Sequence, residues 1–179
     1  MKKEMVMLAG GCFWCTEAIF QRLKGVSNVV SGYSGGEKEK PTYSEVSNES
    51  TGHAETIQIT FDPQIISFEK LLEVFFKLHD PTTVNQQGND VGSQYRSVIF
   101  YHDQKQKETA DRVKQEIEKS GIYRDPIVTE VIPFKNFYKA EDYHQDYYNK
   151  NKNYPYCQAI IDPKIKKLFK EFPQQTKSL

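Results

Sequence analysis

The sequence lacks the features that mark membrane proteins, secreted scaffolds and nucleic-acid-binding proteins. Across 179 residues, no apolar run approaches the roughly 20 residues that a membrane-spanning helix needs. Acidic and basic residues number 24 each, so the formal net charge is zero and we expect neither a nucleic acid nor a membrane surface as partner. The opening MKKEMVML has only a short apolar run and no A-x-A-like cleavage site, so we expect no signal peptide.

Cysteine is also scarce, with three residues at Cys12, Cys15 and Cys157. An odd number of cysteines in a chain of this length is not typical of a disulfide-stapled secreted domain. We therefore expect reduced thiols and a cytoplasmic protein. The length and the 37% hydrophobic content favour a single domain over residues 1–179, and nothing in the sequence requires more than a monomer.

Hydrophobic periodicity predicts alternating strands and helices along the chain. The predicted strands cover residues 4–10, 26–36, 54–61, 96–102 and 127–134, and the predicted helices cover residues 13–23, 67–81, 103–119 and 138–151. Ser67 is the expected N-cap of the second helix, with Pro81 beyond its end, and Gly121 is expected to end the third. This order predicts an α+β fold, a ferredoxin-like split βαβ sandwich with a mostly antiparallel sheet.

The C-terminal segment is harder to place from its composition. The tail from Pro163, KIKKLFKEF, fits either a last short helix or a loosely docked end. We expect the segment from about residue 150 to 179 to be rich in loops and mobile, which would allow Cys157 to move.

The stretch LAGGCFWCTEAIF contains the strongest candidate for a reactive group. Cys12 follows two glycines and begins a predicted helix, so unpaired N–H groups and the positive end of the helix dipole should stabilise its thiolate. Phe13 and Trp14 lie beside it, and Trp14 is the only tryptophan of the chain. Aromatic rings next to a thiol suit a small apolar group such as a methyl, although core packing is the simpler interpretation of such rings.

An acidic partner for this thiol is predicted in the strand AETIQITF. Glu55 alternates in phase with Ile57, Ile59 and Phe61, so its side chain should point to the apolar side of the sheet. Burial would raise the pKa of the Glu55 carboxyl and keep it protonated for general acid catalysis. A glutamate at the rim of the sheet is the alternative interpretation.

A series of motifs resembles the A-type peptide methionine sulfoxide reductases. GCFWCTE resembles the active-site signature of that family, and matching blocks follow in the same order over residues 10–160. These blocks are GYSGG, PTYSEV, GHAETIQITFDP, HDPTTVNQQGNDVGSQYRSVIFY and AEDYHQDY. The resemblance implies an α+β sandwich that reduces the S epimer of methionine sulfoxide, free or in oxidised proteins, with thioredoxin as reductant and without cofactor or metal.

The resemblance also implies roles for individual residues. Cys12 takes the position of the nucleophile and Glu55 that of the proton donor, while the phenols of Tyr43 and Tyr95 would polarise the sulfoxide oxygen. The other matching positions, expected to bind substrate together with Phe13 and Trp14, are Asp90, His144 and Tyr147.

The two remaining cysteines leave an alternative open. Cys157 resembles the recycling cysteine of the family, which converts a sulfenic acid to a disulfide. Cys15 departs from the glycine that many relatives carry, and it fits either core packing or a recycling role. Which of the two thiols attacks first is not decided by the sequence.

Two other functions fit parts of the pattern. Cys12-x-x-Cys15 at a helix start is also found in thioredoxin-like dithiol oxidoreductases, although Cys157 would then have no role. A zinc-binding module could use the three cysteines and a histidine, but structural zinc sites prefer a second closely spaced ligand pair, which the sequence lacks.

Overall fold

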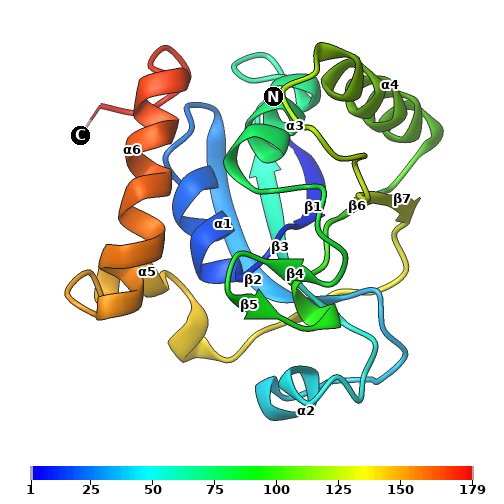
Figure 1. Cartoon of the computed structure of the whole chain (residues 1–179), viewed down its shortest axis with the longest axis vertical. Coiled ribbons are helices and arrows are strands. Elements are labelled where there is room, and N and C mark those ends of the chain that lie inside the picture. The colour runs from blue at the N-terminus through cyan, green and yellow to red at the C-terminus, as the bar shows by residue number, and fades with distance from the viewer. Residues whose placement is uncertain (1, 179) are drawn as a thin grey trace.

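The computed structural model describes residues 2–178, and its first half follows the predicted order of elements (Figure 1). The principal elements are β1 (Glu4–Ala9), α1 (Phe13–Phe20), β2 (Val26–Ser34), β3 (Ala54–Phe61), α3 (Phe68–Leu78), β6 (Val98–Tyr101), α4 (Gln104–Ser120), β7 (Glu130–Pro133) and α6 (Asp162–Glu171). Short elements connect them: α2 (Tyr43–Ser47), β4 (Gln86–Gln87), β5 (Asp90–Val91), a 3₁₀ turn (Ser93–Tyr95), β8 (Tyr138–Lys139), a second 3₁₀ turn (Asp142–His144) and α5 (Tyr147–Lys150). The five predicted strands are confirmed, and α1 ends at Phe20 rather than at residue 23.

Within residues 2–178, six strands form one sheet in the order β7-β6-β1-β3-β2-β8. All neighbouring strands in it are antiparallel except β6 and β7, which are parallel. The prediction of a mostly antiparallel sheet is therefore confirmed. The turn from β1 into α1 lies near the end of β5. The β4–β5 hairpin therefore lies over the start of α1 (Figure 1).

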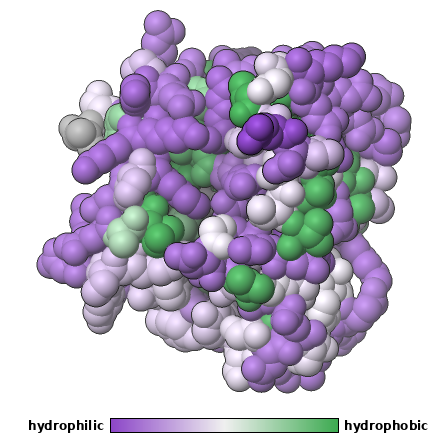
Figure 2. Space-filling view, viewed as in Figure 1, coloured by the Kyte–Doolittle hydropathy of each residue, from purple (hydrophilic) through white to green (hydrophobic). Residues whose placement is uncertain are grey.

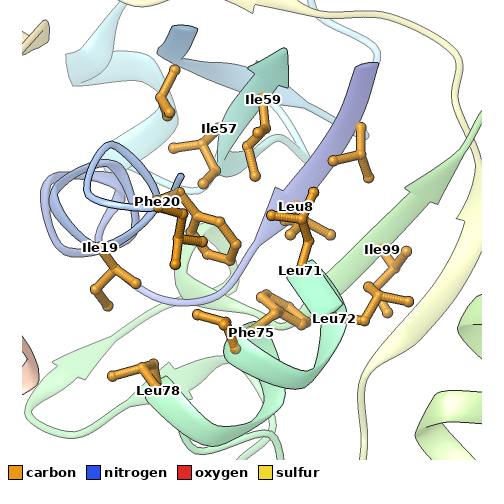
Figure 3. Close-up of a cluster of buried hydrophobic side chains, with 14 of the residues drawn as sticks. Leu8, Ile19, Phe20, Ile57, Ile59, Leu71, Leu72, Phe75, Leu78 and Ile99 are labelled. Atoms are coloured by element: carbon orange, nitrogen blue, oxygen red, sulfur yellow. The ribbon is translucent and has the colours of Figure 1, made fainter. Parts of the chain in front are cut away.

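The main hydrophobic core lies between one face of the sheet and the helices. Alternating residues of β1 and β3, such as Leu8, Ile57 and Ile59, point toward α1 and α3 and are fully buried (Figure 3). Intervening residues such as Met7 and Ala9 join a smaller cluster on the other face, against chain segment 132–137. The period-2 pattern of the strands thus separates the two faces, and the helices cover one of them.

The caps of the two long helices agree with the sequence. The Ser67 hydroxyl accepts a hydrogen bond from the Lys70 N–H at the start of α3, and Gly121 ends α4 in the left-handed conformation, with φ of 71°. A capping box at α2, formed by Thr42 and Glu45, was not predicted, although the PTYSE sequence has the required spacing.

The predicted helix over residues 138–151 is wrong. Tyr138 and Lys139 instead form an edge strand that pairs with β2, and a 3₁₀ turn and a single turn of helix follow. Tertiary contacts outweigh helix propensity here, because the Ala140 N–H donates to the Ser31 carbonyl and Asp146 takes a left-handed conformation, with φ of 55°.

The C-terminal segment is mostly helical rather than rich in loops. A π-helical turn (Cys157–Ile161) runs directly into α6, which confirms the final helix. Leu168 and Phe172 are buried in the main core, and Thr176 pairs with Leu23 in an isolated bridge. The alternative of a loosely docked end is therefore wrong, because apolar side chains and backbone hydrogen bonds attach this segment to the rest of the fold.

One face of the molecule is largely hydrophilic and carries several small, separate hydrophobic patches (Figure 2). Among residues 2–178, no helix is both long and apolar enough to span a membrane.

Candidate active site

Cys12 lies where β1 turns into α1, and two glycines make this turn possible. A Cβ atom at Gly10 would come within 2.9 Å of the Phe75 ring, and Gly11 has φ of 86° with the Gln87 side chain against it. Only glycine allows so close an approach of other groups to this backbone. Cys12 is the N-cap residue of α1, and its side chain is 8% exposed.

The two cysteines of the CxxC sequence lie together in one buried cluster. Burial, followed by the neighbouring Cys15 thiol, raises the pKa of Cys12 well above that of an ordinary thiol. Interaction with Cys12 lowers the pKa of Cys15 to about 7, and Lys164 and Tyr156 act in the same direction. The backbone N–H of Trp14 at the helix start lowers the pKa of Cys12, as we expected, but burial outweighs this effect, so Cys15 is the more acidic thiol of the pair.

Glu55 projects from β3 toward the first turn of α1, as its alternation with the apolar residues predicted. Its side chain is 2% exposed, and its Oε2 accepts a hydrogen bond of 3.0 Å from the Phe13 backbone N–H. Burial raises the pKa of the Glu55 carboxyl to about 8, and the charges of Asp90 and Cys15 act in the same direction. The carboxyl is therefore protonated at neutral pH, and the alternative of a rim glutamate is wrong.

Tyr43 and Tyr95 reach the same region from two different elements. Tyr43 is the first residue of α2, and its backbone N–H donates to Glu141 Oε2 at 3.0 Å. Tyr95 ends the first 3₁₀ turn and packs against the cysteine cluster. Burial raises the pKa of both phenols, and the charges of Glu55 and Cys12 raise it further. Both hydroxyl groups therefore keep their protons at neutral pH and can donate hydrogen bonds.

Trp14 is held by two residues of the AEDYHQDY segment. Its ring stacks on the Tyr147 ring with centroids 3.7 Å apart and an interplanar angle of 4°. Its indole Nε1–H donates to His144 Nδ1 at 3.0 Å. His144 is fully buried, and its Nε2 has no hydrogen-bond partner among residues 2–178. Phe13 lies behind this group, fully buried against Tyr33 and His144.

Glu17 is a residue of this region that the sequence reasoning missed. Its Oε1 accepts the Asp146 N–H at 2.9 Å and its Oε2 accepts the Tyr147 N–H at 3.3 Å. The side chain is 1% exposed, and burial raises the pKa of its carboxyl to about 7. Glu17 therefore connects α1 to the loop that presents Tyr147 to Trp14. The sequence feature that could have identified Glu17 is an acidic residue among the apolar residues of this helix.

Tyr156 is the second residue that was missed. Its hydroxyl donates to Asp90 Oδ2 at 2.7 Å and lies 3.7 Å from Cys15 Sγ, while its ring meets Trp14 edge-on. Asp90 thus lies beside the cysteine pair, as expected from its motif. The position of Tyr156 next to Cys157 was the only hint that the sequence offered.

Cys157 joins Cys12 and Cys15 in one buried cluster. Its side chain is fully buried at the start of the π-helical turn, and burial raises its pKa. The structure thus brings all three thiols together, although Cys157 is 145 positions from Cys12 in the chain.

A cavity of about 270 Å³ gives access to the cysteine pair. Cys12 and Cys15 form one wall, and Asp90 of the β4–β5 hairpin, Tyr156 and Lys164 contribute others. Among residues 2–178, no group of three or more His, Cys, Asp and Glu side chains is arranged to hold a metal ion.

Comparison with known proteins agrees with this geometry. The profile of the family described as "Peptide methionine sulfoxide reductase" matches residues 4–177. The peptide methionine sulfoxide reductase MsrA of Sulfolobus acidocaldarius is 57% identical over 172 residues, which cover 96% of this chain and 97% of the relative.

Solved structures show the same similarity. The reduced form of Mxr1 from Saccharomyces cerevisiae superposes with a TM-score of 0.80 at 36% identity, covering 87% of this chain and 90% of Mxr1. The yeast protein in complex with Trx2 gives a TM-score of 0.57 at 28% identity, covering 82% and 85%. The matched profile and relatives span nearly the whole chain, and the chain therefore belongs to the family of A-type peptide methionine sulfoxide reductases.

Proposed function

We propose that the chain reduces the S epimer of methionine sulfoxide, free or in proteins, with Cys12 as nucleophile and Glu55 as acid. The observation that carries this assignment is the hydrogen bond between the Phe13 N–H and Glu55 Oε2. It fixes a neutral carboxyl at the first turn of the helix that begins with Cys12. A proton donor is therefore held at the helix turn that carries the thiol, as sulfoxide reduction requires.

In the first step, the Cys12 thiol passes its proton to the Cys15 thiolate and attacks the sulfoxide sulfur. The sulfur–oxygen bond of the substrate breaks, and the oxygen takes a proton from Glu55 and ends on Cys12 as a sulfenic acid. Methionine leaves with its sulfur reduced by two electrons, and Cys12 is oxidised by the same two electrons. Glu55 is left as a carboxylate.

Three aromatic side chains support this step. The phenols of Tyr43 and Tyr95, both protonated, donate hydrogen bonds to the oxygen as charge develops on it. Trp14 provides an apolar surface for the methyl group of the substrate, and its ring is fixed by Tyr147 and His144. Phe13 packs against His144 behind this surface. Asp90 accepts a hydrogen bond from the Tyr156 hydroxyl and so fixes Tyr156 next to Trp14.

Cys15 is the thiol that resolves the sulfenic acid first. It lies beside Cys12 in the buried cysteine cluster, and its pKa of about 7 makes it the better nucleophile of the two remaining thiols. Its attack on Cys12 forms a Cys12–Cys15 disulfide, and Glu55 relays the Cys15 proton to the departing oxygen, which leaves as water while Glu55 returns to a carboxylate. Cys157 then attacks Cys15 and carries the disulfide to the C-terminal segment.

Thioredoxin reduces the resulting disulfide and restores the three thiols. The yeast relative Mxr1 forms a complex with Trx2, which supports this choice of reductant. Cys157 is fully buried in the present structure, so residues near the π-helical turn must move before a second protein can reach it. We propose that this movement involves the segment from about residue 150 to the π-helical turn, because Leu168, Phe172 and Thr176 attach the rest of the C-terminal segment to the fold.

The chain acts as one catalytic domain over residues 1–179, and its core is best classed as ferredoxin-like. The strand order β6-β1-β3-β2, with two helical crossovers on one face, supports this classification. A cytoplasmic, monomeric enzyme remains our prediction from cysteine use and composition.

The proposed function is tested by measuring methionine released from the resolved S epimer, with dithiothreitol as reductant. The wild-type protein should turn over and Cys12→Ser should release no methionine. Cys157→Ser should release about one equivalent in the absence of reductant and stop as a Cys12–Cys15 disulfide. Release of methionine by Cys12→Ser would overturn the assignment of the nucleophile.

A further inference from the structure

The cavity beside the cysteine pair contains a positive charge that has no partner. Lys164, in the first turn of α6, lines this cavity together with Cys12 and Cys15. Its ammonium group forms no ion pair with any residue from 2 to 178, although neighbouring Lys167 pairs with Glu171. A lysine ammonium at the wall of a cavity, without a carboxylate partner, is a suitable place for an anionic group of a ligand.

The only carboxylate that lines the cavity, among the described residues, is already engaged. Asp90 accepts the Tyr156 hydroxyl at 2.7 Å rather than pairing with Lys164. Both charges act on the same thiol, since Lys164 lowers the pKa of Cys15 and Asp90 raises it. The ammonium therefore lies within electrostatic range of the Cys15 sulfur, and it shares the cavity with Cys12, at which the substrate reacts.

The size of the cavity suits a single amino-acid residue. Its volume of about 270 Å³ is slightly below the range of drug-sized ligand sites, roughly 300 to 1,000 Å³. In methionine sulfoxide, three carbon atoms separate the sulfur from the carboxyl carbon. Glu55, Tyr43, Tyr95 and Trp14 do not line this cavity, and Cys12 is the residue that it shares with them. A substrate whose sulfur lies at Cys12 can therefore extend its backbone groups into the cavity toward Lys164.

We propose that Lys164 binds the α-carboxylate of methionine sulfoxide when that residue is free or forms the C-terminus of a peptide. An internal residue presents an amide at this position and gains no ion pair. Lys164 thus determines specificity between terminal and internal substrates. This inference rests on the proposed function, because it requires the sulfoxide to react at Cys12.

The experiment compares three S-epimer substrates with wild-type protein and with Lys164→Gln. Free methionine sulfoxide and N-acetyl-methionine sulfoxide carry the carboxylate, whereas N-acetyl-methionine sulfoxide N-methylamide lacks it. The measured quantity is kcat/KM for each carboxylate substrate divided by that for the amide. This ratio cancels any general effect of Lys164 on the thiols, which all three substrates share.

Lys164→Gln should lower the ratio about ten-fold, mainly through KM, because one ion pair in a partly buried site is lost. Lys164→Arg keeps the charge and should retain most of the ratio. Lys166→Gln removes the same charge from an exposed position of the same helix, and it should leave the ratio unchanged.

The outcomes separate the two sources of the carboxylate and the two proposals. A fall for both carboxylate substrates assigns the site to free and C-terminal residues, and a fall for the N-acetyl substrate alone assigns it to peptide C-termini. An unchanged ratio for both overturns the role of Lys164. Failure of the wild-type protein to reduce any of the three substrates would instead refute the proposed function.

Discussion

The backbone N–H of Phe13 donates a hydrogen bond to the carboxyl of Glu55, across 42 positions of the chain. This contact joins the strand that carries the acid to the first turn of the helix that carries the thiol. A change at Glu55 is therefore expected to affect both the chemistry and the stability of the site.

Replacing Glu55 by Gln should slow formation of the sulfenic acid by about 100-fold, because general acids contribute roughly 10²–10⁴ to such steps. The amide can still accept the Phe13 N–H, so the fold of the turn is retained. Single-turnover release of methionine measures this rate. Glu39→Gln, at an exposed position, is the matched control, and an equal rate in Glu55→Gln would remove Glu55 as the acid.

The raised pKa of Glu55 makes the stability of the protein depend on pH. Its value is about 8 in the fold and 4.5 in the unfolded chain, so the folded state holds this proton more tightly. The stabilising contribution is complete below pH 4.5 and is lost as the pH rises through 8. Between pH 5 and 9, wild-type protein should therefore lose about 2–5 kcal/mol of unfolding free energy relative to Glu55→Gln.

Urea unfolding of the two proteins at several pH values measures this difference. Glu17 contributes a loss of the same sign near pH 7, but it is present in both proteins and cancels. A difference between wild type and Glu55→Gln that stays constant from pH 5 to 9 would contradict the raised pKa.

Replacing Glu17 by Gln should make the loop that holds Tyr147 against Trp14 more mobile. An amide offers one acceptor where the carboxylate offers two, so either the Asp146 or the Tyr147 N–H loses its partner. We expect KM for the sulfoxide to rise about five-fold and the unfolding free energy to fall by about 1–3 kcal/mol.

Trp14 is the only tryptophan, so acrylamide quenching of its fluorescence reports directly on the stacked Tyr147 ring. Quenching should increase in Glu17→Gln and stay unchanged in Glu116→Gln, a variant at an exposed position of α4. If the unfolding free energy of Glu17→Gln falls while its quenching and its KM equal those of the wild-type protein, Glu17 has a structural role only.

Local patterns in the sequence were sufficient to predict much of the framework of the site. Strict alternation in β3 placed Glu55 on the apolar side, and two glycines predicted the turn before Cys12. The residues that match family motifs, including Asp90 and His144, also lie around the cysteines.

Contacts between distant segments could not be predicted in this way. Residues 138–151 have helix-like spacing, yet pairing with β2 and the carboxylate of Glu17 impose an extended and turned backbone. Tyr156 reaches Asp90 across 66 positions, and no local periodicity encodes that contact. The order of the thiol pKa values also depends on burial, which the sequence does not provide.

The most direct test of the account is mass spectrometry of the Cys15→Ser/Cys157→Ser double variant after a single turnover with each epimer of methionine sulfoxide. With both resolving thiols removed, the S epimer should yield one equivalent of methionine and one oxygen atom added at Cys12, and the R epimer should yield neither. The reaction should be slower than in the wild-type protein, because Cys15 no longer takes the Cys12 proton, so methionine is measured at completion. Methionine formed without oxidation of Cys12, or no methionine from the S epimer, would contradict the central claim that this thiol attacks the sulfoxide.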